Sequence, residues 1–160
     1  MKLVKLTSAD AQYFLNSTEL MVLRSLLRKF PFTPRFPARV TRRRGDPQTA
    51  ERKKLLNQAL AEHRRQLKAS ARNLLADEKI HSQDNGHLLT LTSEDRETLL
   101  QVLNDIRVGC WHALGKPEAP QPHTAALSNQ EIKWHGLMHF TAHFEAYLVE
   151  DGEAEEKADA

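Results

Sequence analysis

The sequence predicts a mainly α fold, with about four helices, including one long helix, and a small two- or three-stranded β-sheet. Three observations predict it. Apolar residues recur at helical spacing in four stretches, and each stretch opens on a capping signal. Residues 2–6 and 87–92 include alternating polar and apolar positions, as half-buried strands do. The length of 160 residues fits one domain, placed at residues 1–149, followed by an acidic tail at residues 150–160 that we expect to be disordered.

The N-terminal part is expected to form two strands and a helix. Residues 2–6 and 12–16 are strand candidates joined by a turn. Asn16, followed three positions later by Glu19, is a helix-start signature, and Pro31 ends the helix because it cannot continue the hydrogen-bond pattern. The apolar stripe of this helix consists of Leu20, Leu23, Leu26, Leu27 and Phe30.

A connection rich in Pro and Arg, residues 31–46, is expected next, because prolines exclude a regular helix there. Asp46 as a cap and Pro47 as the first helical residue predict the start of the long helix. If unbroken to about Asp77, this helix is roughly 46 Å long. Its predicted stripe is Leu56, Leu60, His63, Leu67, Ala71 and Leu74.

The second half is expected to hold a turn over residues 80–86, a strand over residues 87–92 and two helices. Thr92 with Asp95 predicts one helix start, and Gly115 ends that helix before a Pro-rich linker at residues 115–127. Ser128, with Glu131 at the capping-box position, predicts the last helix. Its predicted core face consists of Trp134, Leu137, Met138, Thr141, Phe144 and Leu148.

Charge is distributed unevenly along the chain. Residues 24–72 hold 15 Lys and Arg against three acids, a net charge of +12, whereas the rest holds 8 against 18, a net charge of −10. This asymmetry indicates a basic surface for an anionic partner, a basic half that docks on an acidic half, or solvated basic helix faces. The candidate partner or nucleic-acid surface is Arg42, Arg43, Arg44, Arg52, Lys53, Arg64, Arg65, Lys68 and Arg72. No helix-turn-helix or zinc-finger spacing accompanies it, so sequence-specific readout is not indicated.

A ladder of histidines lies in the last predicted helix. His135, His139 and His143 fall four residues apart, with Glu131 four residues before the first. Imidazoles at i and i+4 can chelate Zn²⁺ or Ni²⁺, so the ladder is a candidate metal site. The alternatives are a polar helix face and an interface that responds to pH through histidine protonation. The H-E-x-x-H pattern is absent, which excludes the usual metalloprotease motif.

Catalytic constellations are not visible in the sequence. Cys110 lies on an apolar stripe and is expected to be structural, while His112, two residues away, faces another side of the helix. No Gly-rich phosphate loop or nucleophile elbow is present. The single cysteine, the lack of an N-terminal apolar run and the lack of a membrane-length apolar segment predict a cytoplasmic protein without a membrane partner.

Residues 1–115 resemble a bacterial family catalogued as domain of unknown function twenty-seventeen, whose genes often lie beside that of the adaptor ClpS. The resemblance rests on "RFPARV", on "NSTELMVLRSLL" and on a motif formed by Leu103, Asn104, Asp105, Ile106, Arg107 and Gly109. It implies a helical fold and, from one branch, a role in transcription or the stress response. The redox cysteine pair of that branch does not carry over, because only Cys110 is present. The motif is expected to be structural, with Asn104 and Arg107 as i, i+3 neighbours.

Together these features predict a non-enzymatic interaction or regulatory protein with a protein partner and no cofactor. The alternatives are a metal-binding protein that uses the histidine ladder and a protein that binds nucleic acid non-specifically through residues 24–72. A homodimer is a further hypothesis, because Ile132 and Phe140 lie off the predicted core face.

Overall fold

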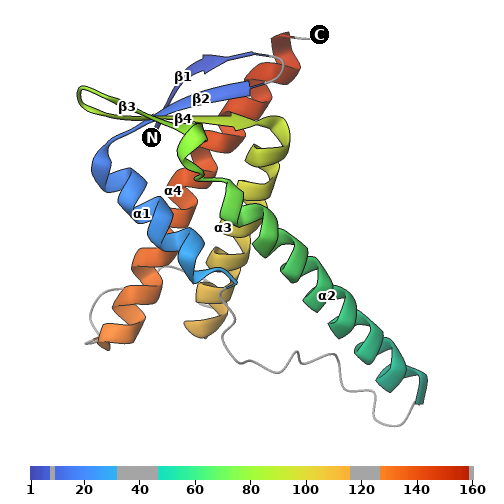
Figure 1. Ribbon diagram of the computed structural model, residues 1–160. Helices are drawn as coiled ribbons and strands as arrows, with labels where there is room; N and C mark the ends of the chain where they lie inside the picture. The colour runs from blue at the N-terminus through green and yellow to red at the C-terminus, as the bar shows by residue number, and fades with distance from the viewer. Residues whose placement is uncertain (8–9, 32–46, 116–126, 159–160) are drawn as a thin grey trace.

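The computed structural model of the protein describes residues 1–7, 10–31, 47–115 and 127–158. A four-stranded sheet lies across one end of a group of helices, and one long helix projects from the body (Figure 1). The predicted connection and linker fall mostly outside the described residues, as do Asp46, Arg42, Arg43 and Arg44. The elements are β1 (Lys2–Leu6), β2 (Asp10–Leu15), α1 (Ser17–Lys29), α2 (Pro47–Asn73), the short 3₁₀ helix η1 (Asp77–Lys79), β3 (Ile80–Gln83), β4 (Gly86–Thr92), α3 (Ser93–Ala113) and α4 (Asn129–Ala158).

The sheet is antiparallel in the order β1-β2-β4-β3. Tyr13 pairs with Leu89 and Ala11 pairs with Leu91, and all four side chains are buried on the face that the helices cover. The mainly helical class is confirmed, but the prediction of two or three strands is wrong, because β3 occupies the segment expected to be a turn. Only Ile80 of β3 is partly buried, so this polar edge strand is held through its backbone pairing with β4 and has no hydrophobic alternation to reveal it.

The predicted starts of α1 and α3 are confirmed. The Asn16 side chain accepts a hydrogen bond from the Glu19 N–H and Glu19 bonds back to Asn16, and Thr92 and Asp95 do the same for α3. Such reciprocal bonds satisfy backbone donors that the first helical turn leaves unpaired. Both helices bury their leucine stripes against the sheet and α4.

The last helix, α4, also begins where the sequence predicts. The Ser128 N–H donates to Glu131 Oε2 at 2.8 Å, and the Glu131 N–H donates to Ser128 Oγ at 3.3 Å. Leu137, Thr141 and Phe144 are buried along α3, as the core face requires. The helix continues to Ala158, and Ala, Glu and Lys, which dominate residues 150–158, all favour helix. The division into a domain at residues 1–149 and a disordered tail stays a prediction.

Only the inner end of the long helix α2 joins the core. It contains 27 residues, about 40 Å along its axis, and ends at Asn73 instead of near Asp77. In the predicted stripe, Leu67, Ala71 and Leu74 are buried, whereas Leu56 and Leu60 are 51% and 44% exposed and His63 is exposed. The outer half of α2 therefore presents its apolar side chains to solvent as it leaves the body (Figure 1).

Candidate functional site

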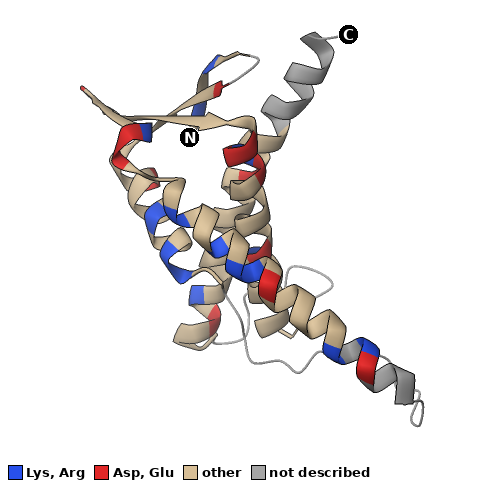
Figure 2. Ribbon diagram, turned by 45° about the vertical axis from the view of Figure 1, so that its right-hand side comes forward, with Lys and Arg blue, Asp and Glu red and all other residues tan. Residues whose placement is uncertain are grey.

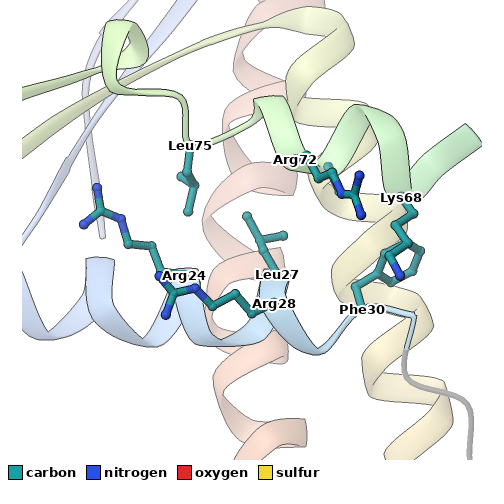
Figure 3. Close-up of a pocket in the computed structure, with 8 residues that line it drawn as sticks. Arg24, Leu27, Arg28, Phe30, Lys68, Arg72 and Leu75 are labelled. Atoms are coloured by element: carbon teal, nitrogen blue, oxygen red, sulfur yellow. The ribbon is translucent and has the colours of Figure 1, made fainter.

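A groove with a volume of about 470 Å³ lies between the C-terminal half of α1 and the inner end of α2 (Figure 3). Its floor consists of hydrocarbon. Phe30 is 4% exposed and Ala71 is 6% exposed, and both belong to the hydrophobic core, while Leu27 and Leu75 pack on that core and are partly buried. The floor is therefore an apolar surface at the edge of the core.

Cations surround this floor. Arg24 and Arg28 extend from α1, and Lys68 and Arg72 extend from α2 (Figure 3). Each pair is spaced i, i+4, so its two side chains lie on the same side of its helix. All four residues are exposed. The groove therefore combines an apolar floor with two positively charged walls.

Among residues 1–7, 10–31, 47–115 and 127–158, no carboxylate lines the groove, and none forms an ion pair with its four cations. Arg28 and Arg72 lie in the last turns of their helices, where a cation interacts favourably with the helix dipole. That interaction explains two of the positions, but the described residues supply no counter-charge to the four cations that converge on one apolar floor. An anion bound in the groove would supply that counter-charge.

The sequence-predicted basic surface divides in the structure. Lys68 and Arg72 line the groove. Arg65 pairs with Glu62 on its own helix at 2.5 Å, and Arg64 contacts Asp105 of α3 at 3.5 Å. Arg52 lies on the outer half of α2, as does Lys53, whose side chain is outside the described residues, and Figure 2 shows this separation of blue segments along α2.

Two groove residues, Arg24 and Arg28, were not singled out from the sequence. The sequence does contain a pattern that could have identified them. The stretch "LRSLLRK" places a basic i, i+4 pair on the side of α1 away from Leu23 and Leu26. What the sequence does not contain is the position of α2. Only the packing of the inner end of α2 brings Lys68 and Arg72 opposite that pair.

The three histidines of α4 are not gathered into one site. His139 and His143 are exposed and His135 is partly buried, and nowhere in residues 1–7, 10–31, 47–115 or 127–158 do three His, Cys, Asp or Glu side chains group as a metal site requires. His135 and His143 are separated by about 12 Å of helix rise, which is too far for one ion. His143 Nε2 instead lies 3.8 Å from Glu19 Oε1 of α1.

The motif of α3 lies where that helix meets α2 and α4. Leu103 and Gly109 are buried. Arg107 donates to Asn104 Oδ1 at 2.8 Å and pairs with Glu145 of α4 at 2.9 Å. Burial raises the pKa of Asp105 and of Glu145, and the Arg partner of each, Arg64 and Arg107 respectively, opposes that rise. The motif therefore connects three helices through polar contacts.

Cys110 is fully buried in the core. Burial raises the pKa of its thiol to about 11, with a small opposing effect from Lys29. The thiolate is the nucleophilic form of cysteine, so this environment suits a packing role. His112 lies beside Trp111, with ring centroids 5.2 Å apart.

Comparison of the chain with protein-family models, curated proteins and solved structures finds no match. The resemblance to domain of unknown function twenty-seventeen therefore stays a prediction. No helix in the described part of the chain has an apolar stretch that could span a bilayer. Functional inference accordingly rests on the geometry of the groove.

Proposed function

We propose that the protein is a non-catalytic interaction protein that binds an acidic, partly apolar segment of a protein partner in the groove between α1 and α2. The observation that carries the proposal is the set of four cations around an apolar floor, with no carboxylate among the described residues that line it. Arg guanidinium groups bind carboxylates through paired hydrogen bonds, and the floor can accept a leucine or phenylalanine side chain. A segment that carries both kinds of group matches both features of the groove.

The floor favours a peptide over single-stranded nucleic acid. Bases bind to proteins largely by stacking on exposed aromatic rings, and Phe30, the aromatic residue of the floor, is only 4% exposed. The exposed apolar surface of the floor belongs mainly to Leu27 and Leu75, which suit an aliphatic contact.

The chemistry of the lining favours binding over catalysis. The groove side chains are hydrocarbons, one Lys and three Arg, and Arg stays protonated at neutral pH, so it does not act as a proton acceptor. Such groups orient and neutralise an anion. The proposed role therefore agrees with the interaction protein that the sequence predicts.

A fluorescence anisotropy titration tests the proposal with a labelled peptide in which Glu residues flank one Leu. Arg28→Gln with Arg72→Gln is expected to weaken binding about tenfold, and Arg28→Lys with Arg72→Lys, which keeps the charge but loses the paired hydrogen bonds, is expected to weaken it by a smaller factor. Lys5→Gln with Lys133→Gln removes equal charge at exposed positions outside the groove and outside α2, and is the matched control. Binding should weaken as salt rises from about 50 to about 300 mM, because exposed charges are screened.

Two results would overturn the proposal. One is the absence of saturable binding to the wild-type protein, and the other is an equal loss of affinity in the groove and control variants. Thermal melts of each variant accompany the titrations, because the loss of cations at helix ends is expected to cost about 0.3–1 kcal/mol each. A variant that stays folded at the temperature of the titration reports on the groove alone.

A further inference from the structure

The groove opens at Lys68 onto the outer half of α2. Residues 54–63 are exposed to solvent over the whole circumference of this helix. A partner seated in the groove could therefore continue along α2 without displacing any described part of the chain. The following inference rests on the proposed function and extends it to the kind of partner.

A row of cations runs outward from the groove along one side of α2. Lys54, Arg65, Lys68 and Arg72 lie within about 60° of one another around the helix axis, and the row is about 27 Å long. All four are exposed, and Lys68 and Arg72 already form a wall of the groove. Figure 2 shows Lys and Arg along the inner half of α2 and again toward its outer end.

A second, apolar line runs parallel to the row, about a third of the way around the helix axis. Leu60 is 44% exposed and lies within about 20° of Ala71, which forms part of the groove floor. The two positions are about 16 Å apart along the helix. Leu60 lies about 120° around the axis from Lys54, and Ala71 lies about 100° from Arg72, so the outer half of α2 repeats the angular arrangement of the groove wall, with an apolar side chain at one side and a cation at the other.

We infer that the groove and the outer half of α2 form one extended docking surface for an acidic amphipathic helix of a partner protein, which lies along α2 for about five turns. Charge complementarity favours an acidic partner, because the described part of α2 carries only two carboxylates, Glu62, which is paired with Arg65, and Glu51, one turn before Lys54, against six Lys and Arg with described side chains. The spacing of the cations along α2 favours a partner segment that is itself helical. The cations are separated by three, four and eleven positions, which face the same side of a helix, and a second helix alongside presents carboxylates at the same intervals.

Three synthetic peptides provide the test. The long peptide has about 18 residues, with Glu along one edge and two Leu residues about three turns apart. The short peptide has about 8 residues and contains one of these Leu residues. The third peptide is the long one with a central Pro, which keeps the charges and breaks the helix. Their affinities are measured against wild type, the groove variant Arg28→Gln with Arg72→Gln, the outer variant Lys54→Gln with Arg65→Gln, and the control Lys5→Gln with Lys133→Gln, whose residues are exposed and lie outside α2.

The long peptide is expected to lose about fivefold in affinity with the outer variant and with Leu60→Ala, and about tenfold with the groove variant. The short peptide is expected to respond to the groove variant alone. The Pro peptide is expected to bind like the short one. This pattern would establish the extended surface.

The contrary outcomes are distinguishable. If the short peptide needs Arg28 and Arg72 but the long one is unaffected by the outer variant, the groove function stands and the extended surface is wrong. If the Pro peptide binds as well as the long one, the partner is not a helix and the inference fails. If a DNA duplex of about 20 base pairs displaces the long peptide more effectively than unlabelled peptide does, the surface binds nucleic acid and the inference fails. If no peptide binds, the proposed function fails with it.

Discussion

Arg64 of α2 lies 3.5 Å from Asp105 of α3, measured from Nη2 to Oδ1, at the point where the long helix leaves the body. Inward of this contact, Leu67, Ala71 and Leu74 are buried in the core. Outward of it, every side chain described on α2 is exposed. The pair thus marks the boundary between the part of α2 that stabilises the fold and the part available to a partner.

Leu67→Ala and Leu56→Ala test that boundary, because both residues belong to the same apolar stripe. Leu67 is 9% exposed, so its truncation is expected to lower the free energy of unfolding by about 2 kcal/mol through lost burial and a new cavity. Leu56 is 51% exposed, so Leu56→Ala should change it by less than about 0.5 kcal/mol. Urea unfolding of both variants measures the difference. Equal losses would mean that the outer half of α2 is packed in solution.

Asp95 is expected to stabilise the protein in a pH-dependent way. Burial opposes its charge, but hydrogen bonds from Lys79 and Thr92 outweigh burial and lower the pKa of the carboxyl below its usual range. Lys79 Nζ lies 2.7 Å from both carboxylate oxygens. Because the unfolded chain binds this proton more tightly than the folded protein does, the contribution is present above the usual Asp pKa and is lost as pH falls through the folded value.

Asp95→Asn should therefore lower the free energy of unfolding by about 1 kcal/mol near pH 7, and by progressively less below about pH 4. Urea denaturation across that range gives the comparison. Glu94→Gln, an exposed change in the same helical turn, is the control and should show a smaller loss. A cost for Asp95→Asn that is constant with pH would contradict this account of the carboxylate.

Glu145 should respond to pH in the opposite direction. Burial raises its pKa, and the ion pair with Arg107 offsets only part of that rise. The folded protein then holds the proton more tightly than the unfolded chain does, so the contribution of Glu145 to stability falls as pH rises above the usual Glu pKa. Arg107→Gln leaves the Glu145 carboxylate without its cation. The change should lower the free energy of unfolding by about 1 kcal/mol at pH 7 and by less near pH 5.

A double-mutant cycle with Glu145→Gln separates this effect from the hydrogen bond between Arg107 and Asn104. The Arg107→Gln change should cost less in the Glu145→Gln background, because no charge then remains to be paired. Identical costs in both backgrounds would show that the ion pair contributes nothing measurable.

Two glycines are expected to respond to alanine in opposite directions. A Cβ at Gly86 would lie 2.5 Å from the Leu15 carbonyl oxygen and 2.7 Å from the Phe14 ring, so Gly86→Ala should lower the melting temperature by forcing β2 and β4 apart. The cost is expected to be about 2 kcal/mol. A Cβ at Gly136 meets nothing within 4 Å, so Gly136→Ala should stabilise α4 by about 0.5–1 kcal/mol. Thermal melts that reverse this order would contradict the tight approach at Gly86.

Local patterns in the sequence predicted the parts of the fold that depend on local chemistry. The starts of α1, α3 and α4 follow from side chains that bond backbone groups three residues away, so Asn16, Thr92 and Ser128 identify them. Strand β3 escaped prediction because it is a polar edge strand that backbone pairing holds in place. The stripe of α2 correctly identified its apolar side, but periodicity does not reveal whether another element covers that side.

The candidate site likewise combines residues that the sequence predicts with an arrangement that it does not predict. Lys68 and Arg72 belong to the basic surface that composition predicts, but a groove exists only because α1 places Arg24 and Arg28 opposite them across Leu27 and the other floor residues. That arrangement depends on contacts between segments far apart in the chain. In the histidine ladder, by contrast, a regular spacing in the sequence does not bring the side chains together. It separates His135 from His143 by about two turns of α4.

Cys110 is expected to resist modification as long as the protein is folded. Its side chain is 0% exposed, and burial raises the pKa of its thiol to about 11, so at pH 8 both access and the thiolate fraction are low. A thiol reagent such as Ellman's reagent should therefore react at the rate at which the core opens, and fully within seconds to minutes in denaturing urea. Gly86→Ala, by destabilising the fold, should speed the reaction, whereas the exposed change Leu56→Ala should not. A fast reaction of the native protein would place Cys110 in an accessible site and restore it as a candidate nucleophile.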